Sequence, residues 1–589
     1  MKRLKPIFFE LLLLLIITVP AFAILLNQTY PSIHDDQHIA RLYLLDAGLR
    51  QASVYPRWVD TLGFGFGYPL YNFYPPLTYY VAEVFHLIGF NFFWSVKLMV
   101  IAGFALASIG MYYLTKPYIG KAAGLLASVL YTYFTYHAVV AYVRGAFAEL
   151  FAMAILPFLL ACLFKIHRDP KLNNALWFGL LLGLIILTHP LIAFPSVLFI
   201  VLLTIILLIA NKGKRLIFVL WTLFGSMLGF GLSAFFWLPS LVEKKHTLVD
   251  SILTSELASY KIHFVYPHQF WYSPWGYGGS GEGPFDGLSF QLGKIHIILT
   301  LISLVLSIIY VYVVLKKKMP WVKKFPAINF YYVSFCFVLI SLFMSTNYSR
   351  FVWDATEFLW YLQFPWRFLT FAALFISICG AFSIYFVTHI FEKINTKKIL
   401  FIMTLCISTL TIFQYQKYFR PQKQLITTDE LRTSREEIAW RVSRTSYEFV
   451  PKGVKTTKTK LGTTIVDIEK DELPKKPYEV IEGSGNVIMI KNHFAYKVFT
   501  VSSQSPTTLQ LNTYNFPGWT AYLDKEKALI NDNNKFKLIT INIPSGEHIV
   551  EFRFENTPIR TFGNLISLTT LTILVIYFAK RKFASTNAV

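Results

Sequence analysis

Acidic residues and cysteines are scarce in this chain of 589 residues. It holds 33 Asp and Glu against 55 Lys and Arg, and only four cysteines. The cysteines all lie within apolar segments without metal-ligand spacing, which argues against a disulfide framework or a zinc site: Cys162, Cys336, Cys379 and Cys406. The sequence also lacks a Walker motif, a dinucleotide fingerprint and a G-x-S-x-G in a suitable setting, so it does not support a soluble nucleotide donor.

Apolar residues dominate what is present. The chain is 55% hydrophobic and 17% aromatic, with a mean hydropathy of +0.49, which is typical of a membrane protein with many spans. A helix needs about 20 apolar residues to cross the hydrocarbon core. The first apolar run is long for a signal peptide, and we expect it to be an uncleaved helix. The apolar segments predict twelve spans: 7–26, 95–115, 122–138, 149–165, 174–188, 191–210, 216–238, 293–315, 328–346, 367–390, 399–414 and 562–579.

The net charge of +22 would suit a nucleic-acid-binding protein, but the basic residues occur in short runs between apolar segments. Such runs mark cytoplasmic loops. With twelve spans, and with the short apolar stretch 77–89 lying along the outer interface, every basic cluster falls on one side. We therefore expect a multi-pass protein of the cytoplasmic membrane with both termini in the cytoplasm and no nucleic-acid partner. The clusters are Lys2, Arg3 and Lys5; Lys116 and Lys121; Arg168 and Lys171; Lys212, Lys214 and Arg215; Lys316 to Lys318 with Lys323 and Lys324; Lys397 and Lys398; and Lys580, Arg581 and Lys582.

Three domains are expected along the chain: a transmembrane domain over 1–414 with a long first outer loop at 27–94, a mainly β extracytoplasmic domain over 415–561, and a final helix and tail over 562–589. Alternating stretches within 445–558 predict a small antiparallel β-sandwich.

One stretch of this domain, "NTYNFPGWTAYLDKEKALI", is typical of an exposed aromatic turn followed by a hairpin. Its aromatic residues, Tyr514, Phe516 and Trp519, either contact carbohydrate or pack in the sandwich core. The sequence favours core packing by about two to one.

Two adjacent acids, Asp35 and Asp36, follow the first apolar segment and are flanked by His34 and His38. Either acid could cap an amphipathic helix that lies on the membrane surface. Two carboxylates with two histidines exceed what a cap requires. The pair could bind a divalent cation such as Mg or Mn, or one carboxylate could act as a general base towards a hydroxyl. Spacing does not choose between these alternatives.

Further charged residues are expected at the outer ends of helices. "AYVRGAFAELF" places Arg144 and Glu149 at the mouths of adjacent helices, where they form either an ion pair or part of a functional site. Arg350 and Arg367 follow in a later outer loop. Arginine at the lipid boundary suits a membrane-anchored phosphate, and snorkelling is the alternative. Aromatic residues of these loops suit a sugar or a lipid headgroup, among them Tyr74 and Trp366.

Five motifs carry a family resemblance: "HDDQHIARLYLLDAG", "YPRW", "GFGYPLYNFYPPLTYY", "YVRGAFAELFAMAILP" and "LQFPWRF". They resemble bacterial membrane proteins described as pyruvoyl-tetrahydropterin-synthase-related. The layout is similar to the GT-C glycosyltransferase superfamily, and "FPGWTAYLD" with "IPSGEHIVEFRF" is similar to the tail of YfhO-like membrane proteins. The resemblance implies a GT-C-like polytopic helical fold with a C-terminal extracytoplasmic β-sandwich. It also implies inverting transfer of a sugar from a polyprenyl-phosphate carrier to an outer glycan, lipid or protein acceptor.

The resemblance also implies roles for individual residues. Asp35 and Asp36 match the acidic motif of the first outer loop, and Glu149 matches a second acidic site, so these three are expected to be catalytic. In a metal-dependent member, Asp36 and Glu149 would hold the cation. Residues expected to contact substrate are His34, His38, Arg144, Arg350, Arg367, Tyr74 and Trp366. The main alternative is a non-enzymatic flippase or transporter of a lipid-linked sugar, which predicts internal repeats and midplane acids. A structural or lipid-binding membrane protein is the third.

Overall fold

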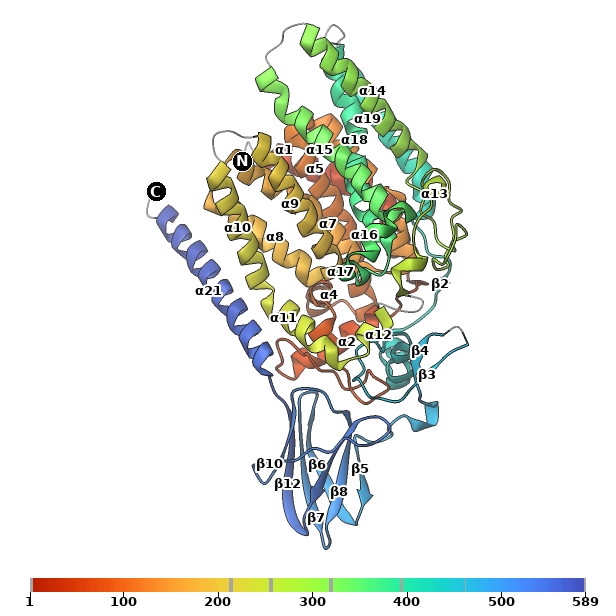
Figure 1. Ribbon diagram of the computed structural model, residues 1–589, viewed down its shortest axis with the longest axis vertical. Helices are drawn as coiled ribbons and strands as arrows, with labels where there is room; N and C mark the ends of the chain where they lie inside the picture. The colour runs from red at the N-terminus through yellow and green to blue at the C-terminus, as the bar shows by residue number, and fades with distance from the viewer. Residues whose placement is uncertain are drawn as a thin grey trace. The chain divides into compact units, whose positions relative to one another are not determined.

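The computed structural model describes residues 4–210, 215–253, 258–316, 321–391, 396–460 and 462–586 (Figure 1). They form two compact units. The first unit comprises Met1–Asp35, Lys97–Phe230 and Ser259–Ile426, and the second unit comprises Asp36–Val96, Gly231–Ala258 and Thr427–Val589. The units therefore group 36–96 of the first outer loop with the C-terminal β region, whereas the predicted domains follow one another along the chain.

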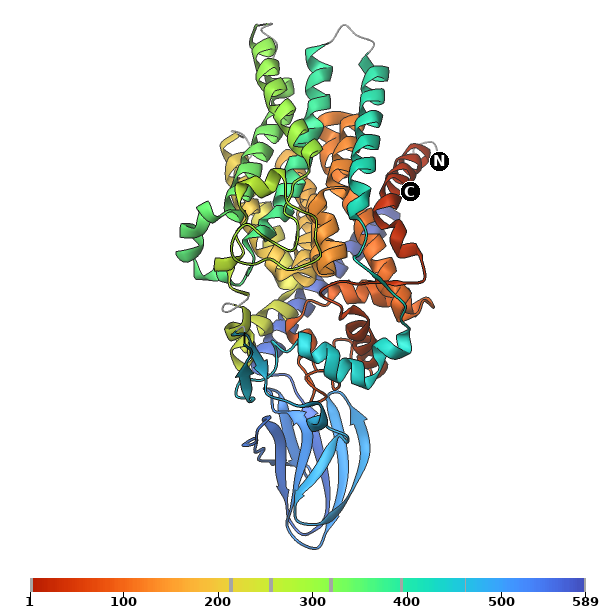
Figure 2. The ribbon, with the colours of Figure 1, turned by 90° about the vertical axis from the view of Figure 1, so that its right-hand side faces the viewer.

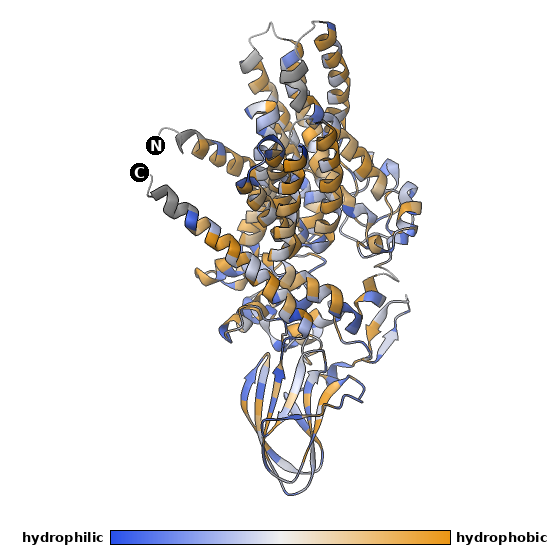
Figure 3. Ribbon diagram, turned by 60° about the vertical axis from the view of Figure 1, so that its left-hand side comes forward, coloured by the Kyte–Doolittle hydropathy of each residue, from blue (hydrophilic) through white to orange (hydrophobic). Residues whose placement is uncertain are grey.

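Long apolar helices build the first unit, and Figure 3 shows hydrophobic residues along most of their length. Helix α18 (Leu369–Ile390) is buried from Leu369 to Phe386 and packs against α14 (Lys294–Lys316) and α15 (Trp321–Ser345). The remaining long helices are α1 (Leu4–Phe22), α5 (Phe92–Thr132), α7 (Phe147–Arg168), α8 (Leu172–Thr188), α9 (Pro190–Ala210), α10 (Arg215–Leu232) and α19 (Thr396–Tyr415).

Ten helical segments of the described chain are long and apolar enough to cross a membrane. The 41-residue α5 contains most of the predicted spans 95–115 and 122–138, with a kink at Gly120, where φ is 80°. The predicted span 174–188 corresponds to the shorter apolar helix α8. The polytopic helical architecture is confirmed, while the number of crossings and the side of each loop stay predictions. Several basic residues used for the topology lie outside the described residues: Lys2, Arg3, Lys212, Lys214, Lys317 and Lys318.

Two antiparallel sheets form the β region of the second unit (Figure 2). One sheet has the strand order β10-β9-β12-β7-β6, and the other has the order β11-β8-β5. Burial alternates along β7, so Phe499 and Val501 face the core between the sheets. The strands are β5 (Tyr478–Glu482), β6 (Gly485–His493), β7 (Tyr496–Ser503), β8 (Thr507–Tyr514), β9 (Trp519–Leu523), β10 (Glu526–Ala528), β11 (Leu538–Ile543) and β12 (Gly546–Phe554). The predicted C-terminal β domain is confirmed, and α21 (Pro558–Thr586) follows it.

The predicted aromatic turn is not exposed. Tyr514, Phe516 and Trp519 expose 0%, 2% and 7% of their surfaces. The ring of Trp58 lies 6.3 Å from that of Phe516 and 5.5 Å from that of Trp519. The prediction of an exposed turn is wrong, because these rings pack within the second unit, as the core-packing alternative predicted. The hairpin after the turn is present as β9 and β10.

Helix α2 (His38–Arg50) occupies the position predicted for a surface helix. Its N-cap is Gln37, which makes no side-chain cap hydrogen bond, so neither Asp35 nor Asp36 caps it. Residues on several sides of α2 are buried, and the helix packs against α4 (Leu77–Leu87) and α20 (Asp429–Thr433) of the same unit. The expectation of a one-faced amphipathic helix is therefore wrong, because its polar faces are also covered by protein.

A buried ion pair joins α11 (Ala234–Glu243) to α21 within the second unit. The Arg560 guanidinium donates to Glu243 at 2.9 Å, and both side chains are almost completely buried. Asn72 and Thr557 donate further hydrogen bonds to the Glu243 carboxylate at 2.7 and 2.6 Å. The remaining guanidinium nitrogens of Arg560 donate to backbone carbonyls, those of Pro517 at 2.7 Å and Glu555 at 3.2 Å.

Candidate functional site

Two backbone hydrogen bonds within the first unit hold His34 and Asp35 in place. The backbone N–H groups of His34 and Asp35 donate to the carbonyls of Val143 and Arg144 at 3.1 and 2.8 Å. The π-helix η2 (Val139–Arg144) ends at Gly145, whose φ is 70°. A Cβ at this glycine would lie 2.6 Å from Cδ1 of Ile33. Glycine is therefore required here, both for its left-handed backbone and for the close approach of the loop.

Glu149 lies at the centre of a buried polar cluster in the first turn of α7, where the helix dipole favours negative charge. The residue is fully buried. Its carboxylate accepts hydrogen bonds from Arg144 Nη1 and from the Tyr136 hydroxyl, each at 2.6 Å. Arg367 Nε lies 3.6 Å from the same carboxylate. The predicted pairing of Arg144 with Glu149 is thus present, and Arg367 joins it.

Aromatic rings cover the arginines. The guanidinium carbon of Arg144 lies 4.6 Å from the centre of the Trp366 ring, which is a cation–π geometry. Trp366 stacks on Phe364 with ring centres 4.6 Å apart. The indole N–H of Trp366 donates to the Ser280 hydroxyl at 3.1 Å. These contacts fix the Trp366 ring beside the cluster.

The buried cluster carries more positive than negative charge. Arg144 and Arg367 expose only 8% and 5% of their surfaces and share the single buried carboxylate of Glu149. Burial disfavours the charged form of Arg144, but the Glu149 carboxylate outweighs this and raises the pKa of Arg144. Arg367 Nε is shielded from solvent and has no hydrogen-bond partner among the described residues. The buried residues therefore leave one donor of Arg367 unused, and the nearby Asp35 carboxylate supplies a second negative charge.

Asp35 supplies an exposed carboxylate next to these arginines. It lies close enough to Arg144 and Arg367 to interact electrostatically with both. Within the described ranges, no residue forms a hydrogen bond or an ion pair with this carboxylate. Desolvation, together with the nearby Arg367, lowers the pKa of His189 to about 3, so this ring is neutral near pH 7. The Asp35 side chain, unlike those of Arg144 and Arg367, is exposed to solvent.

The two acids of the "HDD" motif have different environments. Asp36 belongs to the second unit, where Arg432 Nη1 donates to its carboxylate at 2.7 Å and Arg441 Nη1 lies 3.5 Å away. Of the flanking histidines, His34 is exposed and its Nε2 lies 2.8 Å from the Tyr277 carbonyl. His38 is buried in the second unit, with Nδ1 3.0 Å from the Tyr79 hydroxyl.

Two other predicted substrate contacts lie outside the Glu149 cluster. Arg350 is exposed, and its Nε lies 3.8 Å from the exposed Asp354 carboxylate. Tyr74 belongs to the second unit, where its ring lies 3.9 Å from the guanidinium carbon of Arg41. The sequence prediction did not include Tyr136 or Ser280. Both lie in segments that give no motif, and only tertiary contacts reveal them.

The predicted cation ligands were tested against these contacts. The carboxylates of Asp36 and Glu149 both accept short hydrogen bonds from arginine. In the described part of the chain, no three His, Cys, Asp or Glu side chains gather into a group able to hold a metal ion. The surroundings of both carboxylates suit guanidinium groups rather than a divalent cation.

Residues 71–419 match the model of the family described as "6-pyruvoyl-tetrahydropterin synthase related domain; membrane protein". The chain belongs to this family. The family match spans the Glu149 cluster and the helices that carry it, and it ends before the sandwich. No curated protein matches the chain.

Solved structures to which this chain is similar include arabinofuranosyltransferase AftD from Mycobacteria, with 12% identity and a TM-score of 0.40. They also include the oligosaccharyltransferase of Archaeoglobus fulgidus, with 13% identity and a TM-score of 0.37. Each alignment covers 72% of this chain, but only 28% of the AftD chain and 56% of the oligosaccharyltransferase chain.

Proposed function

We propose that this protein is an inverting membrane glycosyltransferase that moves a sugar from a polyprenyl-phosphate carrier to an extracytoplasmic glycan, lipid or protein acceptor. One observation carries the proposal: the exposed carboxylate of Asp35 is held beside two buried arginines that share only one buried carboxylate. This combination pairs a group able to accept a proton with a place for an anion.

The arginines fit the leaving group. When the bond between the anomeric carbon and the phosphate oxygen breaks, negative charge grows on the polyprenyl phosphate. Guanidinium groups bind phosphate oxygens through charge-assisted hydrogen bonds, and such donors in a water-poor site stabilise developing charge strongly. Arg367 Nε has no hydrogen-bond partner among the described residues and would supply one of these donors. Glu149 holds both arginines in place.

Asp35 is the base in this proposal. Its carboxylate takes the proton of the acceptor hydroxyl while that oxygen attacks the anomeric carbon from the side opposite the phosphate. One C–O bond forms, one breaks with its electron pair going to the phosphate, and the anomeric configuration inverts. Asp36 is less suited to this role because Arg432 and Arg441 already engage its carboxylate.

The position of the cluster suits a donor held in a bilayer. Glu149 lies in the first turn of α7, and Arg367 lies in η7 (Pro365–Phe368), directly before α18. Both helices are candidate membrane spans. A phosphate at the bilayer surface would reach helix ends while its polyprenyl chain stays in the lipid. The basic loops support an outer location for this end in the cytoplasmic membrane.

The test is sugar transfer by the full-length protein in liposomes. The assay supplies a panel of polyprenyl-phosphate sugars with mixed glycan and lipid acceptors, and it compares the wild type with Asp35→Asn and Asp36→Asn. We expect transfer or donor hydrolysis in the wild type and in Asp36→Asn, and its loss in folded Asp35→Asn. If the donor binds and crosses the bilayer while no variant transfers sugar, the protein is a transporter and the proposal fails.

A further inference from the structure

One end of the β-sandwich is hollowed because side chains are missing from two of three neighbouring strands. On the central strand β7, Ser503 lies opposite Gly485 of β6 on one side and Gly546 of β12 on the other. A Cβ added to Gly485 would lie 3.0 Å from the Cβ of Ser503. Gly546 has a φ of 130°, which favours glycine. The two glycines leave the rim of the sheet open around this serine.

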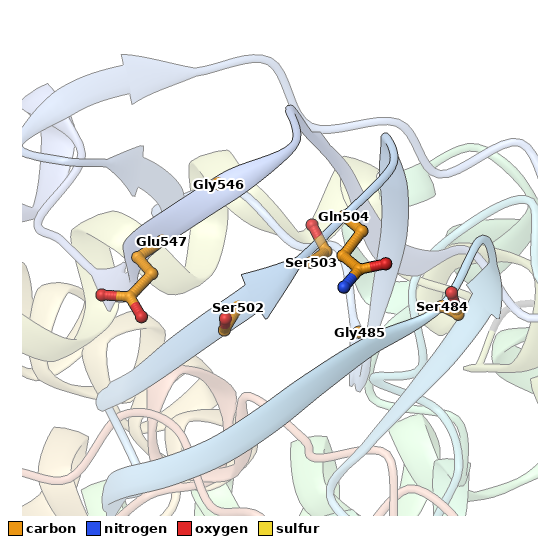
Figure 4. A pocket seen from close by; sticks show the side chains of 7 residues that line it. All are labelled: Ser484, Gly485, Ser502, Ser503, Gln504, Gly546 and Glu547. Atoms are coloured by element: carbon orange, nitrogen blue, oxygen red, sulfur yellow. The ribbon is translucent and has the colours of Figure 1, made fainter.

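The hollow forms a crevice of about 400 Å³, within the size range of small-ligand sites. Figure 4 shows its lining spread over the ends of the three strands. Apart from the two glycines, the lining residues are Ser484, Ser502, Ser503, Gln504 and Glu547. They supply three hydroxyls, one amide and one carboxylate. None of them is basic, aromatic or aliphatic.

This lining selects one ligand chemistry. Hydroxyl and amide groups both donate and accept hydrogen bonds, and the Glu547 carboxylate accepts charge-assisted bonds from hydroxyl groups. A phosphate or another anion would meet a carboxylate without a compensating cation among the lining residues. Ser503 already donates to the Pro544 carbonyl at 3.4 Å, but an apolar ligand would cover the other four polar side chains of the lining without offering them hydrogen bonds. A neutral polyhydroxylated ligand avoids repulsion by the carboxylate and offers hydrogen bonds to the polar side chains.

We propose that this crevice binds a neutral oligosaccharide. If the protein is the proposed glycosyltransferase, this oligosaccharide belongs to the class of its glycan acceptor or product. The assignment as acceptor or product rests on the proposed function, whereas the binding of an oligosaccharide does not. The site differs from the one the sequence suggested, because Tyr514, Phe516 and Trp519 are buried elsewhere in the second unit. Recognition here uses hydrogen bonds of exposed strand ends rather than an aromatic platform.

Binding is measured without turnover, on the full-length protein in nanodiscs, by saturation-transfer difference NMR. The probes are maltotetraose, mannotetraose, galactotetraose and chitotetraose, with inorganic phosphate as competitor. We expect at least one oligosaccharide to bind the wild type. Glu547→Gln should weaken it about tenfold, since a charge-assisted hydrogen bond is lost, and Ser502→Phe should abolish it by filling the crevice. Phosphate should not compete.

The matched control is Glu526→Gln, which removes an exposed carboxylate from β10, outside the crevice lining; its affinity should stay within twofold of the wild type. Both crevice residues are exposed, so folding is checked by the melting temperature of each variant. The proposal is overturned if none of the four oligosaccharides binds the wild type, if Glu547→Gln and Ser502→Phe bind as well as the wild type, or if phosphate displaces the sugar. Glycan binding without any sugar transfer would uphold this inference and contradict the proposed function.

Discussion

Each unit of the molecule buries a carboxylate among guanidinium groups, but the two clusters differ in how fully they are satisfied. In the second unit, Glu243 accepts hydrogen bonds from Arg560, Asn72 and Thr557. The remaining guanidinium nitrogens of Arg560 donate to backbone carbonyls. In the first unit, Arg367 Nε lacks a hydrogen-bond partner among the described residues although it is shielded from solvent.

The difference separates a structural ion pair from a candidate binding site. Leaving a buried polar group without a partner costs about 1 to 3 kcal/mol, and more for a charged group. Native structures retain few such groups, and each calls for an explanation such as an ion or ligand. The Glu243 cluster holds α11 and α21 together, whereas the Glu149 cluster has donor capacity left for an anion.

The largest effect is expected from Asp35, the exposed acid beside the unsatisfied cluster. Asp35→Asn removes the proposed base without touching a buried contact, so transfer should fall by about 10²- to 10⁴-fold while the melting temperature stays unchanged. Asp36→Asn is the matched control and should change transfer less than threefold. Equal losses in both variants would remove the distinction between the two acids.

Arg367→Gln should lower kcat/KM about 100-fold, because it removes the proposed donor to the leaving phosphate. The exposed Arg350 offers a matched control, and Arg350→Gln should stay within threefold of the wild type. Steady-state kinetics in liposomes would measure both. If Arg350→Gln lost as much activity as Arg367→Gln, the phosphate would lie elsewhere.

Arg560→Gln should act on stability alone. It leaves the Glu243 carboxylate buried without its cation, which costs about 3 to 5 kcal/mol. Transfer per folded molecule should stay near the wild-type value. Thermal unfolding in detergent measures the first quantity, and activity normalised to folded protein measures the second. Arg553→Gln, at an exposed pair with Glu551, should cost less than about 1 kcal/mol. An Arg560→Gln variant as stable as Arg553→Gln would contradict the structural role.

Acid should weaken the first unit through His189. The pKa of its ring is lowered to about 3 by desolvation and the nearby Arg367, against about 6.5 in the unfolded chain. Between these values the unfolded state binds a proton that the folded state does not, so stability is complete above pH 6.5 and falls as the pH drops. At pH 5 the loss is about 2 kcal/mol. Melting curves at pH 7.5 and 5 should show a loss of stability that is about 2 kcal/mol smaller in His189→Gln than in the wild type; an equal loss in both proteins would rule His189 out.

The smallest effect is expected from metal removal. Since arginines occupy the carboxylates of Asp36 and Glu149, chelation by EDTA should change transfer less than twofold. The control adds excess Mg²⁺ or Mn²⁺ to chelated protein. A loss with EDTA that either cation restores would show that a metal takes part and that the guanidinium contacts rearrange during turnover.

Local patterns in the sequence predicted most of the helical architecture. Apolar runs of span length predicted the helices, because the period and length of a helix are encoded locally. The pairing of Arg144 with Glu149 was also predictable, since the two residues flank one helix start. The position of Asp35 beside Arg144 was not, because it depends on hydrogen bonds between segments that are distant in the sequence.

Long-range contacts also explain the failures. The expected cap of α2 did not form, and Asp36 instead pairs with Arg432 and Arg441 from much later in the chain. The aromatic residues around Phe516 looked like an exposed turn because nothing nearby in the sequence covers them. Trp58, from the segment Asp36–Val96, does so in the folded second unit.

The narrow space between Gly145 and Ile33 has a consequence for how this sequence can vary. A methyl group on Gly145 would overlap the side chain of Ile33, two residues before Asp35. A larger residue at position 145 should therefore be tolerated only with a smaller one at position 33. Homologous sequences that contain both positions should show them changing together.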